Sequence, residues 1–513
     1  MNNELEDRVR EALNARAQST TLSVLTVHVS DVGADPTAHR EALVVPLARH
    51  RAARVGLVVA AAACLLGLIL VTNRHEPRQP ATPAAPPHWT VAADLAGVFK
   101  APPEAVTPAG QSRDAQRSPN SISLAGVAST THGIVAVGAE QSADSFVAAV
   151  WLSADGATWR RVAHDADAFG ELHPAATPGD TVGYAMSSIV EFRGTLVAVG
   201  GRLDSHLLQQ GETGYPGSTS VVEPVVWTSA NGTNWKRQTL PSTPGNNAGI
   251  MAVAAGPSGL LAVGSTYQTS TSSAATEVWH SDDALTWTRG KFPLASGPRF
   301  DGLSANAIVA FNDQFAAVGT DDGHATAWIT RDGSTWTTAL LPDGISDDSE
   351  VSFARSVATS GGRLIALGSI QSTEPAGVSY SSDTGRITQS GHRDIAVWYS
   401  DDGQTWIRPA LGELADNQLQ IPVSMAAGPH GVVGFVRLFD RDHYVEATIA
   451  SADGEEWTLS DSALNGPRTD LVATPFGWIG IGSERDVDYS AFGLGSQSAI
   501  PAPENASVWV ARA

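Results

Sequence analysis

The chain has 513 residues with 32 basic and 53 acidic side chains, which give it a formal net charge of -21. Such a surface repels the phosphates of nucleic acid and offers no basic patch for them, so we expect no nucleic-acid partner. The one cysteine, Cys64, excludes a disulfide framework and a cysteine-based zinc site within the chain. The 14 histidines show no paired metal-binding spacing, and nucleotide-binding loops are absent, so we expect neither a metal nor a cofactor.

An apolar segment at residues 55–72 contains no charged residue and is long enough to cross a bilayer as a helix. Arginines are denser before it than after it, which predicts a cytoplasmic N-terminus. A cleaved signal peptide would carry only a short basic region ahead of its apolar core, so an uncleaved anchor is favoured. We therefore expect a cytoplasmic segment at 1–54, a short amphipathic helix followed by largely flexible chain, and a Pro/Ala-rich linker at 73–87.

A seven-residue motif occurs six times in the remaining sequence: SADGATW ending at Trp159, SANGTNW at Trp235, SDDALTW at Trp287, TRDGSTW at Trp336, SDDGQTW at Trp406 and SADGEEW at Trp457. Its third position carries a side-chain oxygen that can accept backbone N–H bonds within a tight turn. These residues are Asp155, Asn231, Asp283, Asp332, Asp402 and Asp453. The Gly that usually follows tolerates positive φ, and Ala284 in its place makes positive φ doubtful in the third copy.

This motif resembles the Asp-box, or BNR, repeat of sialidases, sortilin-type receptors, xyloglucan hydrolases and photosystem II assembly factors. The resemblance implies a turn between the third and fourth strands of a β-propeller blade, and it covers about residues 89–513. It implies a fold and a structural role for the six motif residues. It assigns no function.

Seven upstream segments of the type IVAVG, and an aromatic residue eight positions before most motif tryptophans, keep the same register. Each unit is therefore predicted to contain four short antiparallel strands, rich in small residues near the centre of a ring. The seventh unit ends after its third strand, whereas Trp89 begins a strand-like HWTVA before the first unit. We predict an all-β, seven-bladed propeller at 88–513 whose last blade is closed by residues 88–94, removing an exposed edge.

Turns between the first and second strands, and between the third and fourth, are short and constant, whereas the other connections vary in length. In an antiparallel meander these two sets lie on opposite faces, so one face carries all the long loops. Aromatic and acidic residues in these loops suit contacts with a carbohydrate or a peptide. The candidate ligand-binding residues are Tyr215, Tyr380, Tyr444, Asp486, Asp488 and Tyr489. For the short acidic sequences at Asp321 and Asp440, solvated hairpin tips are favoured over the alternative of cation-binding turns.

We expect a single-pass cell-membrane protein with an extracytoplasmic binding or scaffold module that recognises a glycan, a peptide or a cell-surface protein. The alternatives are a glycoside hydrolase and a transmembrane sensor. Sialidases carry an arginine motif in the first blade, where this chain reads SISLAGVAST, so no catalytic residue is assigned. Binding is therefore favoured over catalysis.

Overall fold

The computed structural model of the chain describes residues 87–92, 120–142, 145–171, 181–207, 218–242, 247–268, 273–293, 304–345, 349–373, 377–381, 386–390, 392–411, 420–440, 443–461, 468–483 and 506–512. All of them lie in a compact unit that spans Ala81–Ala513. The predicted cytoplasmic segment, the membrane segment and the linker as far as residue 86 lie outside the described residues. Among the described residues, no helix is long and apolar enough to cross a membrane.

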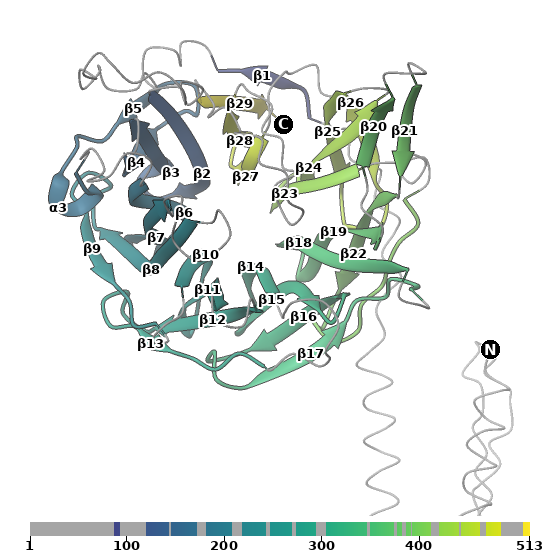
Figure 1. Cartoon of the computed structure of the whole chain (residues 1–513), viewed down its shortest axis with the longest axis horizontal. Helices are drawn as coiled ribbons and strands as arrows, with labels where there is room; N and C mark the ends of the chain where they lie inside the picture. The colour runs from purple at the N-terminus through teal and green to yellow at the C-terminus, as the bar shows by residue number, and fades with distance from the viewer. Residues whose placement is uncertain are drawn as a thin grey trace, which may run out of the picture. The chain divides into compact units, whose positions relative to one another are not determined.

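The described strands are arranged in a ring of antiparallel blades (Figure 1), which we number 1 to 7 in the order of their first strands. A short parallel pairing joins blades 1 and 2 into one sheet. The first strand of every blade packs against the first strand of the next, and that of blade 7 packs against that of blade 1. The all-β class and the four-stranded antiparallel sheets predicted from the repeat pattern are thus confirmed.

The blades differ mainly in the lengths of their strands. Blades 1 and 2 consist of β2 (Asn120–Thr130), β3 (Gly133–Ser142), β4 (Ser145–Ser153), β5 (Trp159–Arg161), β6 (Thr181–Phe192), β7 (Thr195–Leu207), β8 (Ser218–Ser229) and β9 (Lys236–Thr239). Blades 3 and 4 consist of β10 (Asn247–Gly256), β11 (Gly259–Gln268), β12 (Ser273–Ser281), β13 (Thr288–Arg289), β14 (Ser304–Phe311), β15 (Gln314–Asp321), β16 (His324–Thr330) and β17 (Trp336–Leu340).

Blade 5 consists of β18 (Glu350–Ser360), β19 (Arg363–Ser372) and β22 (Arg393–Ser400), and its outer edge is reduced to one bridge between Tyr399 and Ile407. The separate hairpin β20 (Gly377–Ser381) and β21 (Arg386–Ser390) is inserted before β22. Blade 6 consists of β23 (Gln420–Gly428), β24 (Gly431–Asp440), β25 (His443–Ser451) and β26 (Thr458–Asp461). Between blades 1 and 2 lies the one-turn helix α3 (Ala166–Phe169), capped by Asp165.

Blade 7 is built from both ends of the unit: β27 (Arg468–Thr474), β28 (Gly477–Ser483) and β29 (Ala506–Arg512) are joined by β1 (Trp89–Val91) as the outermost strand. β1 runs antiparallel to β29, with Trp89 opposite Ala511. The Trp89 ring is buried and lies 5.0 Å from the ring of Phe435, and its Nε1 donates to Thr448 Oγ1 at 3.1 Å. Because Phe435 and Thr448 belong to blade 6, Trp89 joins two blades as well as two ends of the chain.

Large aromatic side chains fill the space between blades. Each blade is apolar on both faces and buries them against its two neighbours, as in other repeat architectures. The tryptophans of the third strands are fully buried: Trp151, Trp227, Trp279, Trp328, Trp398 and Trp509. Ile449 takes this place in blade 6 and is equally buried.

A β-bulge interrupts the first strand of every blade at the same level. In three blades the bulged residue donates a side-chain hydrogen bond to a carbonyl of the next first strand. These bonds run from Ser187 Oγ to Ile250 O (2.6 Å), from Asn306 Nδ2 to Ala354 O (2.8 Å) and from Thr469 Oγ1 to Leu124 O (2.8 Å). A bulge thus supplies a polar link between blades near the centre of the ring.

The bulge of blade 7 adds a carboxyl group to this set of links. Asp470 Oδ2 accepts from the backbone N of Val127 in blade 1 at 3.0 Å, and its Oδ1 accepts from Ser424 Oγ in blade 6 at 3.0 Å. None of the described residues of β2, β23 or β28, which pack against β27, is charged. Although Asp470 keeps some solvent exposure, desolvation of its carboxyl raises its pKa to about 6.

Replacing Trp89 by Ala is expected to lower the free energy of unfolding by about 3–5 kcal/mol, because it removes a buried indole that joins two blades. Val91 is on the same strand with 54% of its surface exposed. The matched Val91→Ala change should therefore cost less than about 0.5 kcal/mol. Urea unfolding of the full chain measures both. Equal effects of the two substitutions would show that β1 does not stabilise the ring.

Replacing Asp470 by Asn should remove a pH-dependent loss of stability. A folded-state pKa raised above the ordinary 3.8 means that the folded protein binds the proton more tightly, so this stability is complete below about pH 4 and is lost as pH rises through about 6. The wild type should lose on the order of 3 kcal/mol relative to the variant over this range. Urea unfolding at both ends of it tests this, and a difference independent of pH would contradict it.

Candidate functional site

The six predicted ligand-binding residues are not brought into a described site. Tyr215, Asp486, Asp488 and Tyr489 lie outside the described residues. Tyr380 lies on β20 and Tyr444 on β25, and only the backbone of each is described. Their role in ligand binding stays a prediction.

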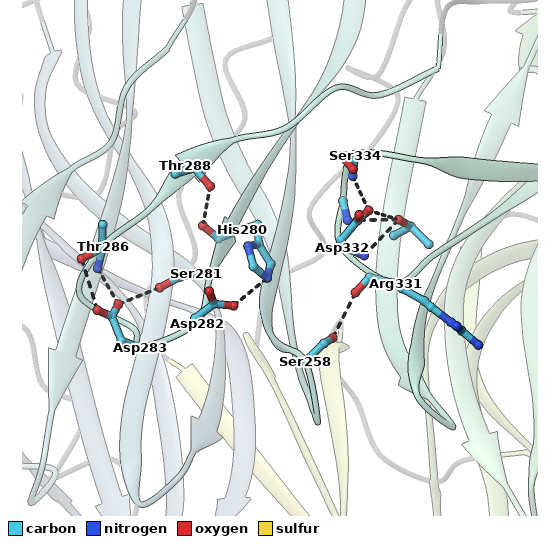
Figure 2. Close-up of polar contacts among 12 residues, drawn as sticks. Ser258, His280, Ser281, Asp282, Asp283, Thr286, Thr288, Arg331, Asp332 and Ser334 are labelled. Carbon is cyan, nitrogen blue, oxygen red and sulfur yellow. Dashed lines mark hydrogen bonds and ion pairs between the residues drawn. The ribbon is translucent and has the colours of Figure 1, made fainter.

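The six motif segments form the turns between the third and fourth strands of blades 1 to 6. In the first of them, Asp155 Oδ1 accepts from the backbone N of Ala157 at 2.9 Å and of Thr158 at 2.7 Å. The indole of Trp159 then donates to the carbonyl of Gly156 at 2.8 Å. Figure 2 shows the turns of blades 3 and 4, where Asp283 contacts Ser281 and Thr286, and Asp332 contacts Ser334.

Hydrogen bonds inside these turns favour the ionised carboxylate. The backbone N–H of Thr158 is the largest influence on Asp155 and lowers its pKa, and that of Thr286 does the same for Asp283. Burial by itself would raise the pKa of Asp402, but the N–H groups of Thr405 and Gln404 outweigh it and hold the pKa low. These carboxylates are already engaged by the turn, which is a structural use.

Ala284 has a positive φ of 65°, although it carries a Cβ where the other motif turns have Gly. The sequence made positive φ doubtful at this position, and that doubt was wrong. Asp283 Oδ1 accepts from the backbone N of Leu285 at 2.8 Å and of Thr286 at 2.7 Å, so the turn bonds impose the conformation. A left-handed backbone conformation at a non-Gly residue costs roughly 1–2 kcal/mol, and the hydrogen bonds of this turn offset that cost.

Motif turns also join neighbouring blades, through hydrogen bonds from the turn between the first and second strands of the preceding blade. Arg193 Nη1 donates to Asp282 O at 3.1 Å, Ser258 Oγ to Arg331 O at 3.0 Å, and Arg363 Nη1 to Asp453 O at 3.2 Å. The second of these bonds is drawn in Figure 2. We call this side of the ring the motif face and the opposite side the loop face. The motif face is thus occupied by contacts that hold the ring together.

On the loop face, a cluster of titratable side chains lies where blade 4 meets blade 5. We call it the blade 4–5 seam, and it comprises His324, Asp343, Glu350, Ser352, His392, Asp394 and Arg408. His324 begins β16, Glu350 and Ser352 lie at the start of β18, and His392 precedes β22. All of these positions are at the ends of strands that face away from the motif turns. The cluster therefore lies on the face for which the sequence predicted function.

Asp343 is the centre of the first half of the seam. Its Oδ2 lies 2.9 Å from His324 Nδ1 and accepts from Ser352 Oγ at 2.6 Å. Burial would raise the pKa of Asp343, but the hydrogen bonds from Ser352 and His324 outweigh it and lower the pKa. The Ser352 hydroxyl bonds to the carboxylate, not to the imidazole, and accepts from the backbone N of Ala325, so it is not arranged as the nucleophile of a Ser-His-Asp triad.

The second half of the seam holds two carboxyl groups around an imidazole. His392 Nε2 lies 2.8 Å from Glu350 Oε1, and their side chains are 38% and 35% exposed. Burial raises the pKa of Asp394, and the negative charge of Glu350 adds to this, while His392 and Arg408 oppose it. The partly exposed imidazole of His392 can donate a hydrogen bond to a ligand, and Glu350 can accept one. Among the described residues, no cluster of His, Cys, Asp or Glu could hold a metal ion.

Sequence reasoning found little of this seam, because Asp343, His392 and Asp394 belong to no motif and come together only through the packing of two blades. His324 follows Asp321 in the acidic sequence that was interpreted as a solvated hairpin tip. That interpretation was wrong for Asp321, which is only 4% exposed. The side chains around Asp440 are outside the described residues.

No protein-family model and no curated protein matches this sequence. Among solved structures, the Trypanosoma rangeli sialidase in complex with the inhibitor DANA is similar to this chain at 16% identity with a TM-score of 0.41, covering 72% of this chain and 60% of the sialidase. A glycosyl hydrolase from Bacteroides ovatus is similar at 13% identity with a TM-score of 0.29, covering 62% of this chain and 82% of that one. Similarities this remote transfer no residue, substrate or activity.

Proposed function

We propose that the propeller is a binding module that recognises a glycan, a peptide or a protein partner through its loop face. The blade 4–5 seam is the observation that carries this proposal. In the same proposal, the predicted segment 55–72 tethers the propeller to the cell membrane, with its N-terminus in the cytoplasm and the propeller on the other side.

The contrast between the two faces supports a binding role. Side chains of the motif face are used in hydrogen bonds between blades, as at Arg193 and Arg363. On the loop face, the connection between the second and third strands is only residues 322–323 in blade 4 but residues 484–505 in blade 7. These connections can vary in sequence without disrupting the ring. Rigid scaffolds commonly carry their recognition residues on such loops.

The seam offers the hydrogen-bonding chemistry that a polar ligand requires. The side chains of His324 and His392 are 39% and 38% exposed, and each is oriented by a carboxylate from another segment of the chain. Imidazoles held in one orientation lose little conformational freedom on binding, which favours affinity. Hydroxyl groups of a sugar and amides of a peptide can both donate to Glu350 and accept from the imidazoles.

Binding is tested by probing arrays of glycans and of peptides with the purified full chain in detergent. We expect a hit whose affinity falls about tenfold or more in His392→Ala, because that change removes a hydrogen bond to a charged partner. His132→Ala is the matched control, since His132 is an exposed histidine on the motif face. Binding that is lost equally in both variants would move the site away from the seam, and no hit on either array would contradict the proposal.

A second candidate function, glycoside hydrolysis, is favoured by one observation. Asp394, whose pKa is raised, lies near Glu350, and pairs of carboxyl groups in unequal environments serve as acid and base in glycosidases. An acid of this kind keeps its proton to higher pH, so the rate should fall as pH rises through its raised pKa.

Hydrolysis is tested by incubating the full chain with a panel of fluorogenic glycosides across acidic and neutral pH. Asp394→Asn should lower the rate about a hundredfold or more, in the range typical of a lost general acid. Asp313→Asn is the control, because Asp313 is exposed on the motif face and pairs with Arg331 at 3.0 Å. A wild-type chain that cleaves nothing would leave the binding module as the function.

A further inference from the structure

Asn231 occupies in blade 2 the position that Asp holds in the other five motif turns. Its side chain makes the same contacts, because Oδ1 accepts from the backbone N of Thr233 at 3.0 Å and of Asn234 at 2.8 Å. Gly232 follows directly, and it has a positive φ of 74°. The described turns therefore contain one Asn–Gly step in a position built for a carboxylate.

An Asn–Gly step can react with itself. The backbone N of Gly232 can attack Cγ of Asn231, since Gly has no side chain to hinder the approach. A new N–C bond forms, the bond from Cγ to Nδ2 breaks, and Nδ2 leaves as ammonia with the proton given up by Gly232. Water then opens one of the two C–N bonds of the resulting succinimide and yields either Asp or isoaspartate. The step needs no oxidant and no partner other than water.

We propose that Asn231–Gly232 is a latent deamidation site, which the folded turn holds unreacted and which reacts when the turn opens. The attacking nitrogen is engaged, because the N–H of Gly232 donates to Ser229 Oγ at 2.9 Å. The side-chain amide is held in place as well, since Ser229 Oγ also donates to Asn231 Oδ1, at 3.3 Å, and this fixes the orientation of Cγ. One serine hydroxyl thus contacts both reacting groups in the folded protein.

Packing around Gly232 restrains the same atoms. Gly232 is buried, and a Cβ placed on it would lie 3.4 Å from side-chain carbons of both Leu152 and Leu196. Its carbonyl accepts from Trp235 Nε1 at 2.9 Å. Closing the succinimide ring would move the Gly232 nitrogen away from Ser229 Oγ and shift the carbonyl that Trp235 contacts, so reaction requires the turn to open first.

The two products differ in their effect on the turn. Asp at this position reproduces the side chain of the other five motif turns, so that product is accommodated. Isoaspartate lengthens the backbone by one carbon and shortens the side chain, so its oxygens no longer reach the N–H groups of Thr233 and Asn234. A chain that deamidates by the second route should lose the blade 2 turn and the hydrogen bond from Trp235 Nε1 to the carbonyl of Gly232.

The test compares deamidation at Asn231 in the native full chain and in the same chain in concentrated urea at the same neutral pH. Proteolysis and mass spectrometry measure the exchange of amide for acid and separate Asp from isoaspartate. We expect reaction in urea to be faster by about tenfold or more, because the native turn must first break several hydrogen bonds. Equal rates in the two conditions would overturn the proposal.

Ser229→Ala isolates the local contacts. In the native chain this variant should deamidate several-fold faster than the wild type. Ser400→Ala is the matched control, because Ser400 makes the same bonds in the blade 5 turn, accepting from Gly403 N at 2.8 Å and donating to Asp402 Oδ1 at 3.0 Å. Acceleration at Asn231 by both variants alike would mean that general loosening, and not the Ser229 hydroxyl, controls the reaction.

Discussion

A blade of this protein can bury its sheet only against the blades on either side, so the structure depends on closing the ring. If the ring stayed open, the sides of two blades would face water, including the pocket of Phe435 and Trp509 that holds the Trp89 ring. Closure is achieved by exchange of a strand, because β1 from the beginning of the unit completes the sheet of β29 at its end. The same solution removes two unpaired strand edges.

Closure also requires polar contacts between the first strands of neighbouring blades, near the centre of the ring. The links between bulges are mostly made by neutral side chains such as Ser187 and Asn306, whose hydroxyl or amide groups can bond to a neighbouring backbone. In blade 7, Asp470 follows the bulged Thr469, bonds to blades 1 and 6, and lacks a basic neighbour among the described residues of β2, β23 and β28. Desolvation of its carboxyl favours the neutral form.

Because the structure depends on a closed ring, the two faces of the propeller have different roles. The geometry of the motif face repeats from blade to blade because its turns carry hydrogen bonds between blades, and loss of those bonds would affect the stability of the ring. The loop face does not carry these turns. Polar side chains can therefore cluster at a junction such as the blade 4–5 seam, where Asp343 joins His324 of one blade to Ser352 of the next.

The sequence by itself determined the repeat, the strands and the turn chemistry, because these follow from local rules. Spacing of side chains along a strand and the oxygen of Asp155 or Asn231 in a tight turn are properties of a few consecutive residues. It also indicated that Trp89 belongs to the last unit, since HWTVA matches the fourth strands in pattern.

Only the tertiary structure decided which side chains share a site. Three further strands, β19, β20 and β21, lie between Glu350 and His392 in the sequence, and Asp343 belongs to a different blade, so no local pattern could bring them together. Packing likewise buried Asp321. The positive φ of Ala284 arises differently, from the hydrogen bonds that Asp283 accepts within its own turn. The fold could be predicted because it follows from such local patterns, whereas the site depends on contacts between residues distant in sequence.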